Sequence, residues 1–281
     1  MNVAKAGAGE VAFDQAAIDE LTEGRLWQLA LIPARAWHSR GVTTLETLQL
    51  PTLVETDDQA DRVAQSAFVP DMLAGLQAAG LTGFAIYPEG LRHVVTYGGI
   101  GVLTSTNLKG KRVRALSADT PSATIKALGG IPVESEDLDA DVNGGRIQAA
   151  ETSLTLLSSG PGQPVMTANV ALYYKFQVLA IRTDSYNKLD PTVQQILRTA
   201  AASTLSQIVA ERPRERDAFR AACADPALGV AVASADTVRA LRAQMRGTLE
   251  DARQDPLTAR SIDAVSKAAG SADTRLLPKC K

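Results

Sequence analysis

Apolar positions along the chain switch between helical spacing and short continuous runs, and glycines or prolines stand where one pattern gives way to the next. Amphipathic spacing predicts helices, whereas short unbroken apolar runs predict buried strands. Helices are expected over residues 13–23, 60–76, 121–128, 191–209, 236–252 and 259–268. Strands are expected over residues 25–32, 81–87, 91–95, 108–116, 131–133, 176–181 and 230–232, with a turn at 88–90. This alternation is typical of an α/β fold with mostly parallel sheets.

The segment over residues 108–130 is the strongest candidate for a ligand site, because it predicts a strand, a loop and a helix in that order. Alternation along the strand places Val113 on one face and Arg112 and Arg114 on the other. Pro121 favours the first turn of the helix that follows. An arginine at the carboxyl end of a strand, beside the free N–H groups of a helix start, is suited to an anion. We therefore expect Arg114 to bind a carboxylate.

Three further residues are candidates for a ligand site at the ends of the strands. Arg35 and Trp37 follow the strand at 25–32, and ligands of open α/β sheets bind at such edges. Arg92 lies within the strand at 91–95. The alternatives are a surface or interlobe ion pair for each arginine and ordinary core packing for the tryptophan.

Composition excludes several classes of function. The net charge of −2 provides no basic field for nucleic acid. No run approaches the roughly 20 apolar residues of a membrane helix, and we expect no signal peptide before the first helix. An acidic run from Glu134 to Gly144 imitates the start of a calcium loop, but Ala150 stands where the bidentate glutamate belongs, so we expect a solvated turn. We expect neither a metal nor a cofactor.

The two cysteines, Cys223 and Cys280, match no metal-ligand spacing. In an oxidising compartment they could pair and tie the C-terminal tail to the preceding helix. Two unrelated thiols are an equally good interpretation at this stage.

Several motifs together resemble the extracytoplasmic solute receptors of TRAP transporters, the DctP-like family of tripartite ATP-independent periplasmic transport. Residues 107–114 and 126–133 are similar to the family's "DLKG-x-K-x-R" and "ALGA-x-PV" signatures. Residues 90–92 are similar to its "G-x-R", and residues 145–152 to its "G-x-VDG-x-EN". Weaker landmarks lie at 48–51 and 188–191. Their order and spacing extend the resemblance over nearly the whole chain.

The resemblance implies roles for the candidate residues. Arg114 matches the arginine that forms the main ion pair with the substrate carboxylate, and Arg92 matches the one that assists it. The loop with Arg35 and the position of Thr152 would line the cleft. Further ligand-binding candidates are Ser117, Glu151 and Trp37.

The resemblance also implies a two-lobed periplasmic-binding-protein-like fold of type II, in which mixed, mostly parallel sheets flanked by helices are joined by hinge strands and a long helix. We expect lobe I to comprise residues 1–89 and 177–215, and lobe II residues 90–176 and 216–281. Such a receptor would bind a small-molecule carboxylate, act as a monomer with membrane permease subunits, and be periplasmic or extracellular and membrane-associated. It would perform no catalysis.

The sequence departs from the family pattern in ways that affect the site. Leu116 replaces a proline, Gln148 an aspartate and Thr152 an asparagine, while the segment from 132 to 151 is short and acidic. Substrate preference therefore cannot be inferred from the family. The chain also starts near the family's second strand, so either it begins late or has been shortened, or the receptor fills the gap otherwise.

Two alternative functions remain open. One is an enzyme on the same scaffold with Glu151 or His93 as general base. The chain has no nucleophile elbow, metal set or phosphate loop that would favour it. The other is a ligand sensor that passes lobe closure to a signalling partner.

Overall fold

The computed structural model describes residues 11–24, 27–115, 119–135, 137–271 and 280. Its strands form one mixed seven-stranded sheet in the order β1-β6-β2-β5-β3-β4, with β7 also paired to β6. Pairs among β1, β6, β2 and β5 are antiparallel, whereas β3–β4, β3–β5 and β6–β7 are parallel. The strands are β1 (Leu29–Pro33), β2 (Leu81–Thr96), β3 (Arg112–Arg114), β4 (Ile131–Val133), β5 (Ala149–Thr152), β6 (Val165–Arg182) and β7 (Gly229–Ala231).

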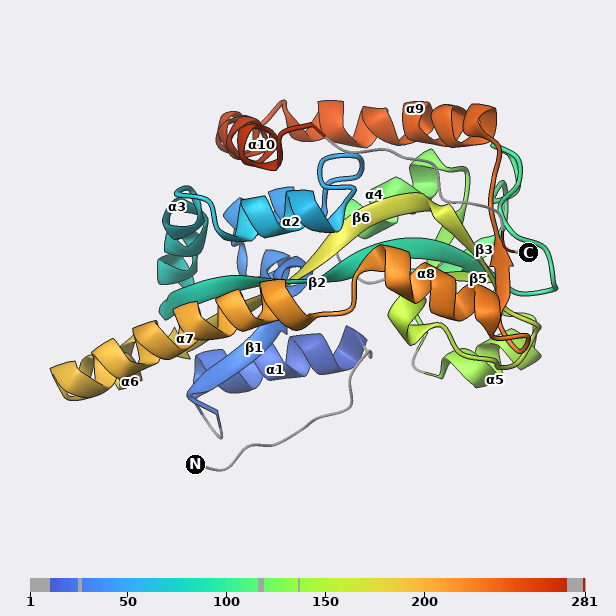
Figure 1. Cartoon of the computed structure of the whole chain (residues 1–281). Helices are drawn as coiled ribbons and strands as arrows, with labels where there is room; N and C mark the ends of the chain where they lie inside the picture. Colours follow the sequence, from blue (N-terminus) through green and yellow to red (C-terminus); the bar gives the residue numbers. More distant parts are fainter. Residues whose placement is uncertain (1–10, 25–26, 116–118, 136, 272–279, 281) are drawn as a thin grey trace.

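Helices lie on both sides of the long strands, with α9 and α10 above and α1 below in the view of Figure 1. The α-helices are α1 (Val11–Glu23), α2 (Asp57–Ala64), α3 (Val69–Ala74), α4 (Asp119–Ala127), α5 (Leu138–Asn143), α6 (Thr183–Asn187), α7 (Pro191–Glu211), α8 (Glu215–Ala224), α9 (Ala235–Ala252) and α10 (Pro256–Ala269). Short 3₁₀ helices are η1 (Ala34–Arg40), η2 (Thr43–Gln49), η3 (Gly75–Ala79) and η4 (Leu154–Leu156). The predicted α/β class is confirmed.

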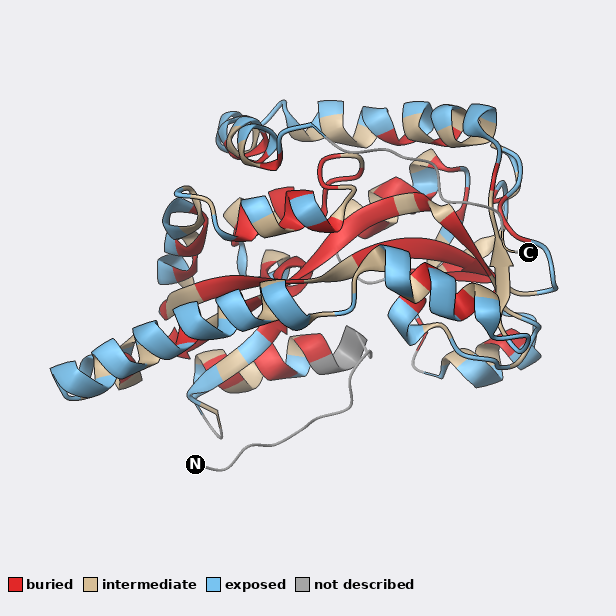
Figure 2. Cartoon of the chain, in the orientation of Figure 1, coloured by how far each residue is buried: buried red, intermediate tan, exposed pale blue. Residues whose placement is uncertain are grey.

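The two central strands, β2 and β6, are longer than the strands that the apolar runs predict. The turn expected at 88–90 is wrong, because these residues continue β2, and the register with β6 shifts between Pro88 and Gly90. A bulge accommodates a proline, which cannot donate a ladder hydrogen bond. β2 and β6 are therefore continuous, buried ribbons through the middle of the molecule (Figure 2).

Local signals explain most helix boundaries. Asp190 accepts a hydrogen bond from the Thr192 N–H at 2.8 Å and Pro191 opens α7. The helix predicted over 60–76 is divided instead into α2, α3 and η3. Pro70 explains the division, since a proline is tolerated in the first turn of α3 but not inside a longer helix.

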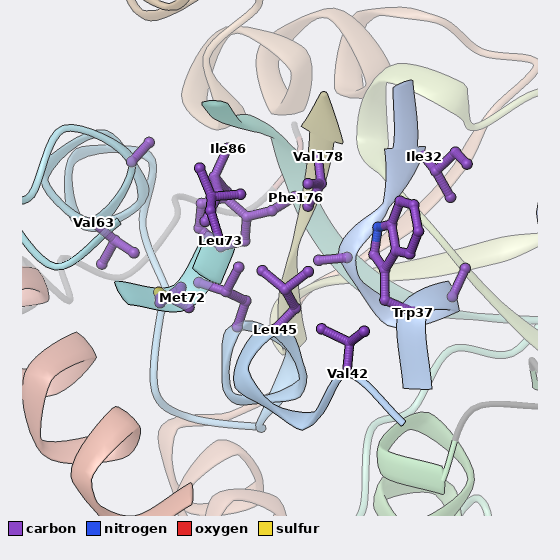
Figure 3. Close-up of a cluster of buried hydrophobic side chains, with 14 of the residues drawn as sticks. Ile32, Trp37, Val42, Leu45, Val63, Met72, Leu73, Ile86, Phe176 and Val178 are labelled. Atoms are coloured by element: carbon purple, nitrogen blue, oxygen red, sulfur yellow. The ribbon is translucent and has the colours of Figure 1, made fainter. Parts of the chain in front are cut away.

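The largest hydrophobic cluster joins α1, η1, η2, α2, β2, β6 and α10. Trp37 is fully buried there, and its ring lies beside Ile32 while Val42 and Leu45 lie below it in Figure 3. This position agrees with the packing alternative for Trp37 and fixes the 3₁₀ turn that carries Arg35.

Smaller clusters gather around β3, α4 and α9 and around η4 and α8. The lobe boundaries stay a prediction. The position of α10 differs from the one expected. Ile262, Val265 and Ala269 of α10 pack in the largest cluster, against elements assigned to lobe I, although residues 216–281 were expected in lobe II.

Cys223 and Cys280 form a disulfide, so the end of the chain is tied to α8. The acidic run expected to be a turn instead contains α5, whose N-cap Asp137 accepts the Ala140 N–H. No helix among the described residues has the length and apolar character needed to cross a membrane.

Candidate functional site

The two arginines of strand β3 have different neighbours. Arg112 donates through Nε to the Arg146 carbonyl at 2.6 Å and through Nη2 to the Gly145 carbonyl at 2.5 Å, so it holds the loop after α5. Arg114 is in register with Ala150 of β5 and lies beside Tyr97. Burial raises the pKa of the Tyr97 phenol, and the Arg114 guanidinium partly opposes that shift.

On β5, the strand next to β3, the buried carboxylate of Glu151 joins two of the predicted arginines. Arg35 Nη1 lies 3.3 Å from Glu151 Oε1, and Arg92 Nε lies 3.6 Å from Glu151 Oε2. All three residues are less than one-tenth exposed. Because η1, β2 and β5 are distant in sequence, this arrangement is a product of the tertiary fold. It agrees with the ion-pair alternative stated for the arginines.

The ion pairs continue at both ends, so that charges of opposite sign alternate. Arg35 Nη2 contacts Asp14 Oδ2 at 3.3 Å, Arg92 Nη2 contacts Glu89 Oε1 at 2.6 Å, and Lys175 Nζ contacts Glu89 Oε2 at 3.0 Å. We call these six residues the charge cluster: Asp14, Arg35, Glu89, Arg92, Glu151 and Lys175. The three carboxylates and the three cations of the cluster balance in formal charge. This balance is needed because a buried ion without a partner is unfavourable.

The neighbouring charges outweigh burial at Arg35 and Glu89 but not at Lys175. Burial disfavours the cation at Arg35, but the carboxylates around it, led by Glu151, raise its pKa above the ordinary value. Burial lowers the pKa of Lys175, and the nearby cations Arg92 and Arg35 lower it further. At Glu89 burial is outweighed by Lys175 and Arg92, so the pKa of that carboxyl falls.

A small pocket of about 10 Å³ lies beside the cluster, between η1, η2 and the start of α4, and Arg35, Gln49 and Thr120 line it. Gln49 is fully buried, yet neither atom of its amide group has a hydrogen-bond partner among the described residues. Tyr173 is fully buried beside Arg35 and interacts with its guanidinium. Buried polar groups of this kind are usually satisfied, so the pocket presents donors and acceptors for a polar molecule.

The remaining predicted site residues lie in different places. Thr152 is on β5 in register with His93 of β2. Trp37 packs in the largest hydrophobic cluster. Ser117 and Leu116 lie outside the described residues. Helix α4 begins at Asp119, and Gly129, at a φ of 80°, follows its end as predicted.

Sequence reasoning missed five residues of this region, although several carried a signal. Lys175 interrupts an apolar run, and Gln49 stands between leucines ahead of a proline. A polar residue inside a buried segment needs a partner or a role. Glu89 was hidden by the predicted turn, whereas Asp14 and Tyr173 carried no signal in the sequence.

Comparison with known proteins gives a matching family model and solved structures with a similar fold. The family model described as "Bacterial extracellular solute-binding protein, family 7" matches residues 2–255. A search of curated proteins gives no match.

Similar solved structures include three periplasmic binding proteins. A TRAP periplasmic solute-binding protein from Ralstonia eutropha, with bound (S)-2-acetolactate, has 18% identity and a TM-score of 0.77 over 90% of this chain and 84% of that one. A TRAP periplasmic solute-binding protein from Shewanella oneidensis, with bound succinate, has 15% identity and a TM-score of 0.77 over 92% and 84%. The ectoine-binding protein of a Halomonas elongata TRAP transporter has 15% identity and a TM-score of 0.78 over 94% and 97%. At these identities the likeness establishes the two-lobed fold alone.

Proposed function

Because the chain belongs to the bacterial extracellular solute-binding proteins of family 7, we propose that it binds a small organic acid and delivers it to a TRAP transporter. Its partners are the ligand and the membrane permease subunits, and it acts outside the cytoplasm as a monomer without catalysis. The Cys223–Cys280 disulfide supports an oxidising compartment. Solved structures similar to this chain hold succinate and acetolactate, both carboxylates.

The observation that carries this proposal is the carboxylate of Glu151 between two buried guanidiniums. The interior of this fold is therefore built to stabilise a carboxylate, and Arg114 brings a further guanidinium one strand away. A planar guanidinium can meet a ligand carboxylate through two parallel hydrogen bonds. We assign Arg114 as the main ligand contact, with Arg92, Arg35, Thr152 and Ser117 around it.

The same contacts suggest how binding is linked to closure. Arg35 belongs to the proposed lobe I, whereas Glu151 and Arg92 belong to the proposed lobe II. The ion pair between Arg35 and Glu151 would thus join the two proposed lobes next to the proposed ligand position. A carboxylate ligand adds further bridges of the same kind, so its binding favours the closed arrangement.

A thermal-shift screen tests the proposal, since a ligand that binds only the native state raises the melting temperature. Succinate, galacturonate and neutral sugars are the probes. We expect a carboxylate to raise the midpoint and Arg114→Ala to lose about 2 to 5 kcal/mol of binding free energy, because the carboxylate then lies buried without its main partner.

Arg246→Ala is the matched control, because Arg246 is an exposed arginine on α9 and does not belong to the charge cluster. It should bind like the wild type. Neutral sugars that shift the midpoint while carboxylates do not, or an Arg114→Ala protein with unchanged affinity, would contradict the assignment.

A further inference from the structure

The side-chain amide of Gln49 is buried beside the charge cluster without a hydrogen-bond partner. Gln49 is the last residue of η2, it is fully buried, and neither Oε1 nor Nε2 bonds to another described residue. Its sequence neighbours Leu48 and Leu50 are buried and apolar, so an apolar side chain would suit this position. Because an unpaired buried amide destabilises a fold, its presence here points to a group that binds it.

The amide lies in the wall of the small pocket beside the charge cluster. The residues around this pocket are Arg35, His38, Glu46, Gln49, Thr120 and Pro121. Its charged side chains have partners, since His38 contacts Glu46 and Arg35 contacts two carboxylates of the charge cluster. Among the described side chains of this wall that carry a charge or an amide, Gln49 is therefore the one left to bind a further polar group.

The size of the pocket and the chemistry of an amide restrict which group binds there. A volume of about 10 Å³ holds one water-sized group. The Oε1 atom of Gln49 accepts hydrogen bonds and its Nε2 atom donates them, so a group that satisfies both atoms must donate and accept. A hydroxyl does both. A keto oxygen or a carboxylate only accepts, an ammonium only donates, and a second amide is too large.

We propose that Gln49 binds a hydroxyl group of the ligand and that the ligand is a 2-hydroxy acid. This inference rests on the proposed function, in which Arg35 is one of the ligand contacts. Because Arg35 and Gln49 line the same pocket, a carboxylate at the arginine places its 2-hydroxyl at the amide. Gln49 is then a specificity-determining residue, since an acid without the hydroxyl leaves the buried amide unpaired.

Calorimetric titration of the full chain with matched acids of three sizes tests the proposal. The first set is lactate, pyruvate and propionate, the second is malate and succinate, and the third is gluconate and 2-deoxygluconate. In the set that binds best, the 2-hydroxy acid should bind at least about 10-fold more tightly than the acid without the hydroxyl. Gln49→Met removes the amide at similar volume and should reduce this ratio to about 1. Urea unfolding should show that this variant still folds, because no hydrogen bond within the protein is lost.

Gln207→Met is the matched control, because Gln207 is exposed on α7 and does not line the pocket, so it should keep the wild-type ratio. If Gln49→Met does not fold, the ratio in the wild-type protein decides alone. Acids that bind equally with and without the hydroxyl, or a folded Gln49→Met protein that keeps the preference, would overturn this inference and leave the proposed function standing. Failure of every acid to bind would overturn both.

Discussion

The charge cluster and a second, larger cavity lie back to back across the strand β2, and they use buried space in opposite ways. At the cluster, alternating charges fill the interior and leave a pocket of about 10 Å³. At the second cavity, which lies between β2, β6, α2, α8 and α9 and which we call the rear cavity, apolar side chains leave about 730 Å³, and the charges stand at the rim. Consecutive residues, Arg92 and His93, serve the two regions.

This difference affects how much each ion pair contributes to the stability of the fold. In the charge cluster each ion depends on its neighbours, because an unpaired buried charge is very unfavourable. At the rear cavity some ion pairs, such as Asp58 with Arg214 and Asp217 with Arg220, are exposed to water, so each of these contributes less. Loss of Glu151, the most buried carboxylate of the cluster, should therefore cost more than loss of a partner at the cavity rim.

The largest effect is expected from Glu151→Ala. This change leaves Arg35 and Arg92 buried without the carboxylate they share. Removal of one partner from a buried ion pair costs about 3 to 5 kcal/mol, and urea unfolding at pH 7 measures the loss. Asp236→Ala, which removes an exposed partner of Arg239, is the control and should cost less than about 0.5 kcal/mol. Similar losses in both variants would mean that the cluster does not stabilise the fold.

A smaller effect is expected at the rear cavity from Glu215→Ala. His93 is buried, and its ring nitrogens face Glu215 Oε1 at 2.7 Å and the Val170 carbonyl at 3.2 Å. Loss of the carboxylate leaves one ring nitrogen without its partner, which costs about 1 to 3 kcal/mol in urea unfolding. A double variant with His93→Leu should recover part of that loss, since both polar partners are then absent. A double variant with fully additive losses would show that the two side chains are not coupled.

Much of the fold follows from local patterns in the sequence. The helices near both ends, the strand at β4 and the glycine after α4 were predicted because spacing and caps are local signals. The continuity of β2 through Pro88 was not predicted. A proline in the sequence indicates a turn unless the neighbouring strand, here β6, is known.

The candidate site was predictable only in part. Arg35, Arg92 and Glu151 were named from strand edges and family resemblance, and the structure brings these three together. Their pairing could not be predicted, because three distant segments meet there only after folding. Asp14 joins them from a helix whose sequence gives no sign of a buried charge.

The smallest effect is expected from Glu89→Gln. Glu89 lies between Arg92 and Lys175 in the charge cluster, and its loss should change how the free energy of unfolding depends on pH. The pKa of Glu89 in the folded protein lies below its ordinary value of 4.5, mainly because Lys175 and Arg92 outweigh burial. The unfolded chain therefore takes up this proton more readily, and stability from Glu89 is present above pH 4.5 and lost as the pH falls below it. At pH 7 the substitution should cost about 1 kcal/mol. Urea unfolding between pH 3.5 and 7 should show this difference shrinking toward acid, whereas a difference that stays constant would place the stabilisation outside the ionised carboxylate.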